Sequence, residues 1–162
     1  MAYFAGGCFW GVEYYLEQMD GVASVESGYM GGTVDHPTYE QVSDHGTGHL
    51  ETVRVHYDSK QVSYEQIARR FFEIHDPTQA DGQGPDIGAQ YQSAVFYSTP
   101  QEKAITEKLI GLLRKRGYHV VTQVRPASTF WPAEEYHQDH YQRTGGKPYC
   151  HVRVRRFDRD AR

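Results

Sequence analysis

The sequence predicts an α+β fold: a two-layer ferredoxin-like sandwich with a mixed sheet, an additional C-terminal helix and strand, and long loops. From Met1 to Ser98 the apolar pattern reads strand, helix, strand, strand, helix, strand, which is the split arrangement of ferredoxin-like folds. The 162 residues, of which 38% are hydrophobic, suffice for one core. We therefore expect a single domain over residues 1–162, in which about residues 143–162 form a mobile C-terminal segment.

The elements of the first half are assigned from the spacing of apolar residues. After a short strand and two glycines, apolar residues recur at helical spacing until Gly21. Val53, Val55 and Tyr57 alternate with polar residues, so one face of that strand is buried. The expected elements are a strand over 1–5, a helix that ends near 19, a strand over 22–30, a loop over 31–48 with one helical turn near 39–42, and a strand around 53–57.

Capping residues mark the helices of the second half. Ser63 and Gln66 form a capping box, Pro77 follows the end of that helix, and Thr99 with Pro100 begins the next one. The expected elements are a helix over 64–74, a long glycine-rich loop over 78–90, a strand over 93–98, a helix that ends at Gly117, a strand over 120–124, a polar helix over 134–142 and a loosely held strand over 150–154.

Composition and charge argue against several classes of function. The formal net charge is -4 with both signs interspersed, which gives no electrostatic reason to bind DNA, RNA or an anionic membrane. No apolar run approaches the roughly 18 residues of a membrane span, and the N-terminus lacks the pattern of a signal peptide. Two cysteines are too few for a disulfide framework. We expect a cytoplasmic monomer without a metal or another cofactor.

Cys8 is the first candidate for chemistry, because it follows Gly6 and Gly7 where a strand turns into a helix. A thiol at this position lies among the N–H groups at the positive end of the helix dipole, which favours its ionisation. Thiolate at neutral pH is what a catalytic cysteine needs. A buried cysteine that only fills space is the alternative.

The residues around Cys8 also resemble those of a known family. Gly-Cys-Phe-Trp-Gly at residues 7–11 is similar to the signature of the A-type peptide-methionine (S)-S-oxide reductases. The similarity runs from Phe4 to Cys150, with Leu50 in place of a small residue and without the second resolving cysteine of some members. The other motifs that match in order are Gly28-Tyr29, Gly31-Gly32, Pro37-Thr38-Tyr39, Gly48-His49, Glu51, His75-Asp76-Pro77-Thr78-Gln79, Asp86, Gly88, Gln90-Tyr91, Phe130 and His137-Gln138.

The resemblance implies an oxidoreductase that repairs proteins after oxidative stress by reducing the S epimer of methionine sulfoxide, free or in proteins. Cys8 then attacks the sulfoxide sulfur, Phe9 and Trp10 surround its methyl group, and Glu51 gives a proton to the oxygen. The sulfenic acid formed on Cys8 condenses with Cys150, and thioredoxin or a similar dithiol protein reduces the resulting disulfide.

The resemblance also implies a polar socket for the sulfoxide oxygen. Tyr39 and Tyr91 lie in loops that could meet Glu51, and Asp86 is close to Tyr91 in the sequence. Glu51 can be protonated near neutral pH only if its pKa is raised, by burial or by a second carboxylate such as Asp86.

Three other functions remain open on the sequence alone. A cysteine hydrolase or acyltransferase would pair Cys8 with a histidine, and the candidates are His49, His75, His137 and His140. A metal site could use His137 with Asp139 and His140, or His49 with Glu51, although neither is a standard zinc pattern, and residues 137–141 are expected to be a solvated helix face. A non-catalytic binding module is the third, and it leaves the surroundings of Cys8 unexplained.

Overall fold

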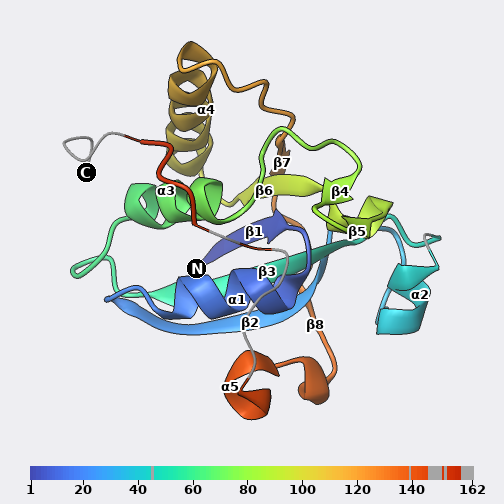
Figure 1. Cartoon of the computed structure of the whole chain (residues 1–162). Coiled ribbons are helices and arrows are strands. Elements are labelled where there is room, and N and C mark those ends of the chain that lie inside the picture. Colours follow the sequence, from blue (N-terminus) through green and yellow to red (C-terminus); the bar gives the residue numbers. More distant parts are fainter. Residues whose placement is uncertain (45, 139, 146–150, 152, 158–162) are drawn as a thin grey trace.

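The computed structural model describes residues 1–44, 46–138, 140–145, 151 and 153–157, and Figure 1 shows how they are arranged. Within these residues the main sheet has six strands in the order β7-β6-β1-β3-β2-β8, and β4 and β5 form a small second sheet. The strands are β1 (Ala2–Gly6), β2 (Val22–Met30), β3 (Leu50–Tyr57), β4 (Gly82–Gln83), β5 (Asp86–Ile87), β6 (Ser93–Tyr97), β7 (Gln123–Pro126) and β8 (Trp131–Pro132). The helices are α1 (Phe9–Glu17), α2 (Tyr39–Ser43), α3 (Tyr64–Ile74), α4 (Pro100–Lys115) and α5 (His140–Thr144), with the 3-10 turns η1 (Ala89–Tyr91) and η2 (Glu135–His137).

The order and direction of the strands confirm the predicted ferredoxin-like sandwich. β6, β1, β3 and β2 are successive neighbours and pair antiparallel. β7 adds to β6 in the parallel direction, so the sheet is mixed as expected. β8, which the sequence pattern did not predict, pairs with β2 at Gly28 and Tyr29 and forms the opposite edge.

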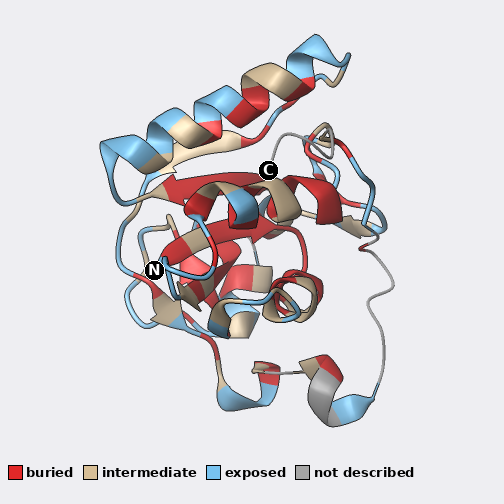
Figure 2. Cartoon of the chain, turned by 90° about the vertical axis from the view of Figure 1, so that its left-hand side faces the viewer, coloured by how far each residue is buried: buried red, intermediate tan, exposed pale blue. Residues whose placement is uncertain are grey.

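The core lies mainly on one face of the sheet. The strand residues Phe4 and Val53 share a hydrophobic cluster with Leu16 of α1 and Phe71 of α3, and α4 contacts α3 and β6. Figure 2 shows the buried residues gathered in the strands and on the inner sides of these helices. A smaller cluster around Phe130, between β7 and β8, covers the other face. No helix in the described part of the chain is long and apolar enough to cross a membrane.

β7 begins later than the predicted strand over 120–124. The Val121 N–H donates to the Pro77 carbonyl at 2.8 Å, so this part of the chain is tied to the loop after α3. The ladder with β6 begins only at Gln123, opposite Ala94. A hydrogen bond to a distant loop, which apolar spacing does not reveal, therefore sets the start of the strand.

The predicted polar helix over 134–142 was wrong, because it is divided into η2 and α5. Gln138 has an extended backbone and ends η2. Its side-chain amide accepts from the Ser27 N–H and donates to the Ser27 carbonyl, each at 2.8 Å. The chain therefore leaves the helical path at Gln138 to bond the backbone of β2.

The predicted strand over 150–154 is not formed by His151, Arg153 or Val154. Cys150 and Val152 lie outside the described residues. The Val154 N–H donates to the Glu73 carbonyl at 2.7 Å, so this residue bonds the C-terminal part of α3 instead of a strand.

The long loop predicted over 78–90 is held by its own hydrogen bonds. β4 and β5 form a two-stranded hairpin in which Gln83 lies opposite Asp86. The Gln83 side-chain amide also bonds the N–H and the carbonyl of Asp76, each at 2.6 Å. This hairpin fixes the position of Asp86 and leads into η1, whose last residue is Tyr91.

Candidate active site

Cys8 is buried and occupies the N-cap of α1, as its position after two glycines predicted. The glycines are needed for close packing at this turn. Gly7 has a φ of +94°, and a Cβ there would lie 2.6 Å from the side chain of Gln83. A Cβ at Gly6 would lie 2.8 Å from the ring of Phe71. The β4–β5 hairpin and α3 therefore fix the turn that presents the thiol.

Glu51 lies on β3, opposite Tyr29 of β2, on the face of the sheet that α1 covers. One of its carboxyl oxygens accepts the Phe9 N–H at 3.2 Å, and the residue is only 1% exposed. The other oxygen has no hydrogen-bond partner among the described residues. The pKa of Glu51 is raised to about 8, mainly by burial. The hydrogen bond from the Phe9 N–H lowers this pKa, and the Asp86 carboxylate raises it. The group is therefore mainly protonated at neutral pH, and burial is the dominant cause.

Tyr39 and Tyr91 meet beside Glu51, as predicted. Tyr39 is the first residue of α2, which a capping box of Thr38 with Gln41 begins. The two tyrosine side chains hydrogen-bond to each other. Burial raises the pKa of each, and Glu51 raises both further once it is ionised, so both hydroxyls remain proton donors.

Asp86 belongs to the same group of charges. Its carboxylate raises the pKa values of Glu51 and Tyr91, after the larger effect of burial on each. The structure thus brings Glu51, Tyr39, Tyr91 and Asp86 together near the N-terminus of α1, although they come from β3, α2, η1 and β5.

Phe9 and Trp10 belong to a cluster of aromatic side chains. The Phe9 ring is buried, with ring centroids 6.5 Å from Tyr39 and 5.3 Å from His137. Trp10 is partly buried, stacks on His140 at 3.7 Å and donates its indole N–H to His137 at 3.1 Å. Phe9 and Trp10 are therefore both part of this aromatic cluster, and Trp10 is the more accessible of the two.

Glu134 is a component of this site that sequence reasoning missed. Its carboxylate accepts the Tyr29 hydroxyl at 3.0 Å, the Tyr39 N–H at 3.2 Å and the Tyr136 hydroxyl at 3.4 Å. It therefore fixes the start of α2 and with it Tyr39. A cluster of Tyr and His close behind Glu134 was the available signal, but the polar composition of the segment led to its assignment as a helix surface.

His49 and His75 serve structural roles. His49 uses both ring nitrogens, with the Gly32 N–H at 3.0 Å and the Val34 carbonyl at 2.7 Å. His75 is buried and bonds the Phe71 carbonyl at 2.6 Å and the Ser93 hydroxyl at 2.7 Å. Burial lowers the pKa of His75 to about 3, so it is neutral. Neither can serve as the base of a cysteine hydrolase without losing these bonds.

The expectation that residues 137–141 form a solvated face was wrong, since His137 and Tyr141 are both buried. Asp139, which one possible metal site required, lies outside the described residues. Among the described residues no three His, Cys, Asp or Glu side chains come together as metal ligands do.

Leu50 does not shape the site. It lies in the smaller hydrophobic cluster, with Met30 and Phe96, on the face of the sheet opposite to Glu51. The departure from the family pattern at this position therefore affects the packing of that cluster.

Cys150 lies outside the described residues, but the residue that follows it is close to the site. His151 is buried, and its ring bonds the Gly6 carbonyl at 2.7 Å. The same ring occupies the space that a Cβ at Gly11 would fill. The Tyr15 hydroxyl donates to the His151 carbonyl at 3.2 Å, which fixes the backbone as well.

Comparisons with known proteins identify the family of this chain. The family model of peptide methionine sulfoxide reductases matches residues 1–162. Peptide methionine sulfoxide reductase MsrA of Acinetobacter baumannii is 44% identical over 153 residues, which cover 94% of this chain and 88% of the relative. Methionine sulfoxide reductase A of Corynebacterium diphtheriae has a TM-score of 0.80 at 32% identity, and the match covers 89% of this chain and 74% of that one.

Mxr1 of Saccharomyces cerevisiae in its reduced form has a TM-score of 0.86 at 29% identity, and the match covers 94% of this chain and 90% of that one. Mxr1 has also been solved in complex with Trx2, and that structure, with a TM-score of 0.60 at 21% identity, is similar in fold. The match to the family model over the whole length and the identity to the bacterial relative show that the chain belongs to the peptide methionine sulfoxide reductase family, whose members reduce methionine sulfoxide.

Proposed function

We propose that Cys8 is the nucleophile and Glu51 the proton donor with which this chain reduces methionine sulfoxide to methionine. The observation that carries the proposal is the buried Glu51 carboxyl, which has a pKa of about 8 and bonds the N–H of the residue after Cys8. A neutral carboxyl can give a proton to the oxygen that leaves the sulfoxide sulfur, which a carboxylate cannot.

In the first step the Cys8 thiolate attacks the sulfoxide and the oxygen takes up a proton from Glu51. The sulfur–oxygen bond of the substrate breaks, its sulfur gains two electrons and leaves as the thioether of methionine. The Cys8 sulfur loses two electrons and carries the oxygen as a sulfenic acid. The hydroxyls of Tyr39 and Tyr91, which lie beside Glu51, donate to the oxygen while its negative charge develops.

The arrangement of the site favours one substrate handedness. The aromatic residues Phe9 and Trp10 offer an apolar wall for the methyl group, and Glu51 with the tyrosines offers hydroxyl donors for the oxygen. A sulfoxide sulfur with its methyl and oxygen directed in this way accepts the thiolate in one configuration. The family resemblance identifies this configuration as that of the S epimer.

Cys150 is proposed as the resolving thiol, because His151 is fixed beside Gly6 and Gly11 and adjacent Cα atoms lie about 3.8 Å apart. Its thiol displaces the hydroxyl of the sulfenic acid, which forms a disulfide with Cys8 and releases water. A mobile segment over about 143–162 stays a prediction. Of its described residues, His151 bonds Gly6 and Arg153 bonds Glu73 at 3.1 Å.

Thioredoxin is proposed as the reductant, since thiol exchange with a dithiol protein would return both cysteines to the reduced state. The complex of yeast Mxr1 with Trx2 supports a thioredoxin as this partner. We further propose that the protein acts as a monomeric single domain over 1–162 in the cytoplasm, without a resident cofactor.

Mass spectrometry after reaction with one equivalent of L-methionine S-sulfoxide tests the proposal. We expect the intact mass to fall by two hydrogen atoms and a peptide pair to be linked through Cys8 and Cys150. Cys8→Ser should form no methionine, because a hydroxyl is not ionised at neutral pH. Continued turnover by Cys8→Ser, with an unchanged circular dichroism spectrum, would refute the assignment of the nucleophile.

A further inference from the structure

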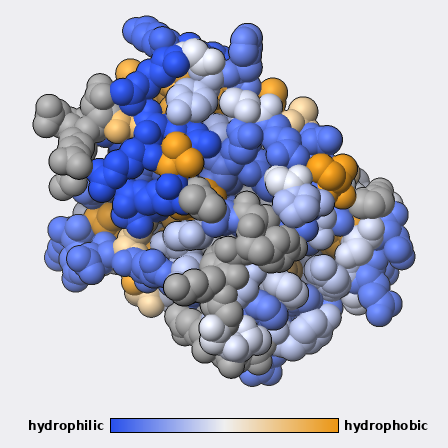
Figure 3. All heavy atoms as spheres, viewed as in Figure 1, coloured by the Kyte–Doolittle hydropathy of each residue, from blue (hydrophilic) through white to orange (hydrophobic). Residues whose placement is uncertain are grey.

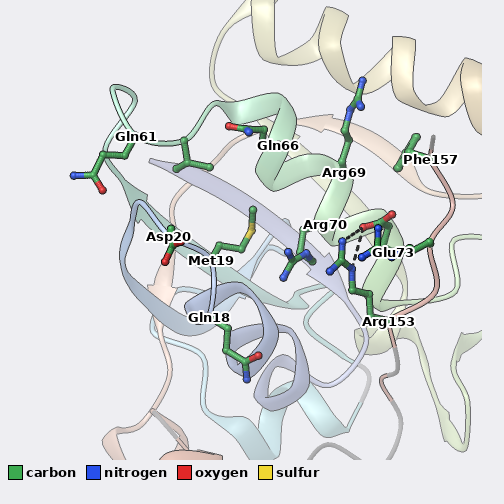
Figure 4. A pocket seen from close by; sticks show the side chains of 12 residues that line it. Gln18, Met19, Asp20, Gln61, Gln66, Arg69, Arg70, Glu73, Arg153 and Phe157 are labelled. Atoms are coloured by element: carbon green, nitrogen blue, oxygen red, sulfur yellow. Dashed lines mark hydrogen bonds and ion pairs between the residues drawn. The ribbon is translucent and has the colours of Figure 1, made fainter. Parts of the chain in front are cut away.

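A cavity of about 450 Å³ lies between the C-terminal end of α1, the helix α3 and residues 153–157 (Figure 4). α1 has nine residues and Cys8 caps its other end, so the cavity is separated from the thiol by about 13 Å of helix. The charged residues that line the cavity are Arg69, Arg70, Arg153, Arg155, Asp20 and Glu73. Four positive groups therefore face two negative ones in a chain whose net charge is -4.

Two of the four arginines are already engaged. Arg69 bonds Glu65 at 2.6 Å, and Arg153 bonds Glu73 at 3.1 Å. Arg70 and Arg155 make no hydrogen bond or ion pair with any described residue. Their guanidinium groups are thus available to a ligand.

The surroundings of Arg70 show that positive charge is in excess. Arg70 is partly buried, and in Figure 4 it points into the cavity beside Arg153. Burial lowers the pKa of Arg70, the charges of Arg153 and Arg155 lower it further, and the attraction of Glu73 opposes this only in part. Arginine nevertheless stays charged at physiological pH. Figure 3 shows a strongly hydrophilic surface on the face that carries α3 and the C-terminal residues.

We propose that this cavity binds a phosphorylated small molecule, whose phosphate groups are held by Arg70, Arg153 and Arg155. The planar fork of a guanidinium matches two phosphate oxygens, which a point charge such as lysine does not. Met19, Val62 and Phe157 also line the cavity and offer apolar surface to the organic part of such a ligand. The volume lies within the range of pockets that hold small organic ligands, about 300–1000 Å³.

Titration of the full chain with ADP at low ionic strength, followed by isothermal calorimetry, tests the proposal. We expect saturable binding of one ADP per chain. Arg70→Gln and Arg155→Gln should each weaken binding about tenfold or more, since each removes charge-assisted hydrogen bonds to phosphate. Arginine and glutamine have similar helix propensity, so Arg70→Gln should leave α3 formed, and Arg155 is exposed, so its replacement does not threaten the fold.

Two controls separate a specific site from general attraction. Lys103→Gln removes the same charge from the exposed side of α4, outside the cavity, and should change ADP affinity less than twofold. Cys8→Ser should leave ADP binding unchanged, because the active site is at the other end of α1. The proposal is overturned if ADP does not saturate the protein at millimolar concentration, if Lys103→Gln weakens binding as much as Arg70→Gln, or if Cys8→Ser abolishes binding.

Discussion

Replacement of Glu51 by glutamine should make the protein more stable and far less active. The Glu51 pKa is about 8 in the folded chain and 4.5 for an ordinary glutamate. At a pH between these two pKa values, Glu51 has lost its proton in the unfolded chain but keeps it in the folded chain. The free energy of unfolding therefore falls as the pH rises. The slope is about 1.4 kcal/mol per pH unit, which amounts to about 3 kcal/mol at pH 7.

Glutamine carries no such penalty, because it is neutral in both states. Glu51→Gln can also keep the carbonyl oxygen that accepts the Phe9 N–H at 3.2 Å. We therefore expect the variant to be more stable than the parent at pH 7 by up to about 3 kcal/mol, with the difference vanishing near pH 4.5. The chemical step should slow about 100-fold or more, since the transferable proton is lost.

Urea denaturation of both proteins at several pH values from 5 to 8, with single-turnover rapid quench at pH 7, measures both effects. Parallel stability curves for parent and variant across this range would show that Glu51 is ionised in the folded chain. A single-turnover rate equal to that of the parent would refute its role as proton donor, whatever the stability. Glu107→Gln is a matched control, because Glu107 lies on the exposed side of α4, away from the site, and should change neither the stability at pH 7 nor the rate appreciably.

Three further predictions concern the substrate oxygen and the second thiol. Tyr39→Phe and Tyr91→Phe should each slow single turnover modestly, and the double variant should slow it by more than the sum of the two effects. A strictly additive pair would mean that the two hydroxyls do not share the oxygen. Cys150→Ser should release about one methionine per enzyme at near parental rate and then stall with thioredoxin, carrying a dimedone-reactive Cys8. Undiminished cycling of that variant would make Cys150 structural. Chiral chromatography should show consumption of the S epimer alone, and equal loss of both epimers would contradict the proposed methyl wall.

Local signals in the sequence predicted most of the fold. The capping box of Ser63 with Gln66 involves residues three positions apart, and the structure has it. Thr99 likewise caps α4, and alternation of apolar residues marked β3. Such signals depend on residues that are close in the chain, so one sequence suffices to read them.

The features that escaped prediction depend on contacts between distant segments. Glu134 bonds Tyr39 across 95 residues, and Gln138 bonds Ser27 across 111. Neither contact leaves a trace in composition or periodicity, so the segment was read as a polar helix. The same reason explains the late start of β7, which follows from the bond between Val121 and Pro77.

For the site, the family resemblance named the residues, and the structure showed which interactions shift their pKa values. The sequence left open whether burial or Asp86 raises the pKa of Glu51, and burial has the larger effect. That answer requires knowledge of how completely α1 covers the carboxyl, which depends on packing in three dimensions.

The place of β1 in the sheet has a consequence for synthesis of the protein on the ribosome. β1 pairs on one side with residues 53–55 and on the other with residues 93–96. Since translation proceeds from the N-terminus, the strand that leads into Cys8 leaves the ribosome well before either partner strand. Until then Glu51 and Tyr91 are not in place beside Cys8. The nascent chain therefore carries an ordinary cysteine, and the capacity to reduce sulfoxides arises only when the middle of the chain has closed around it.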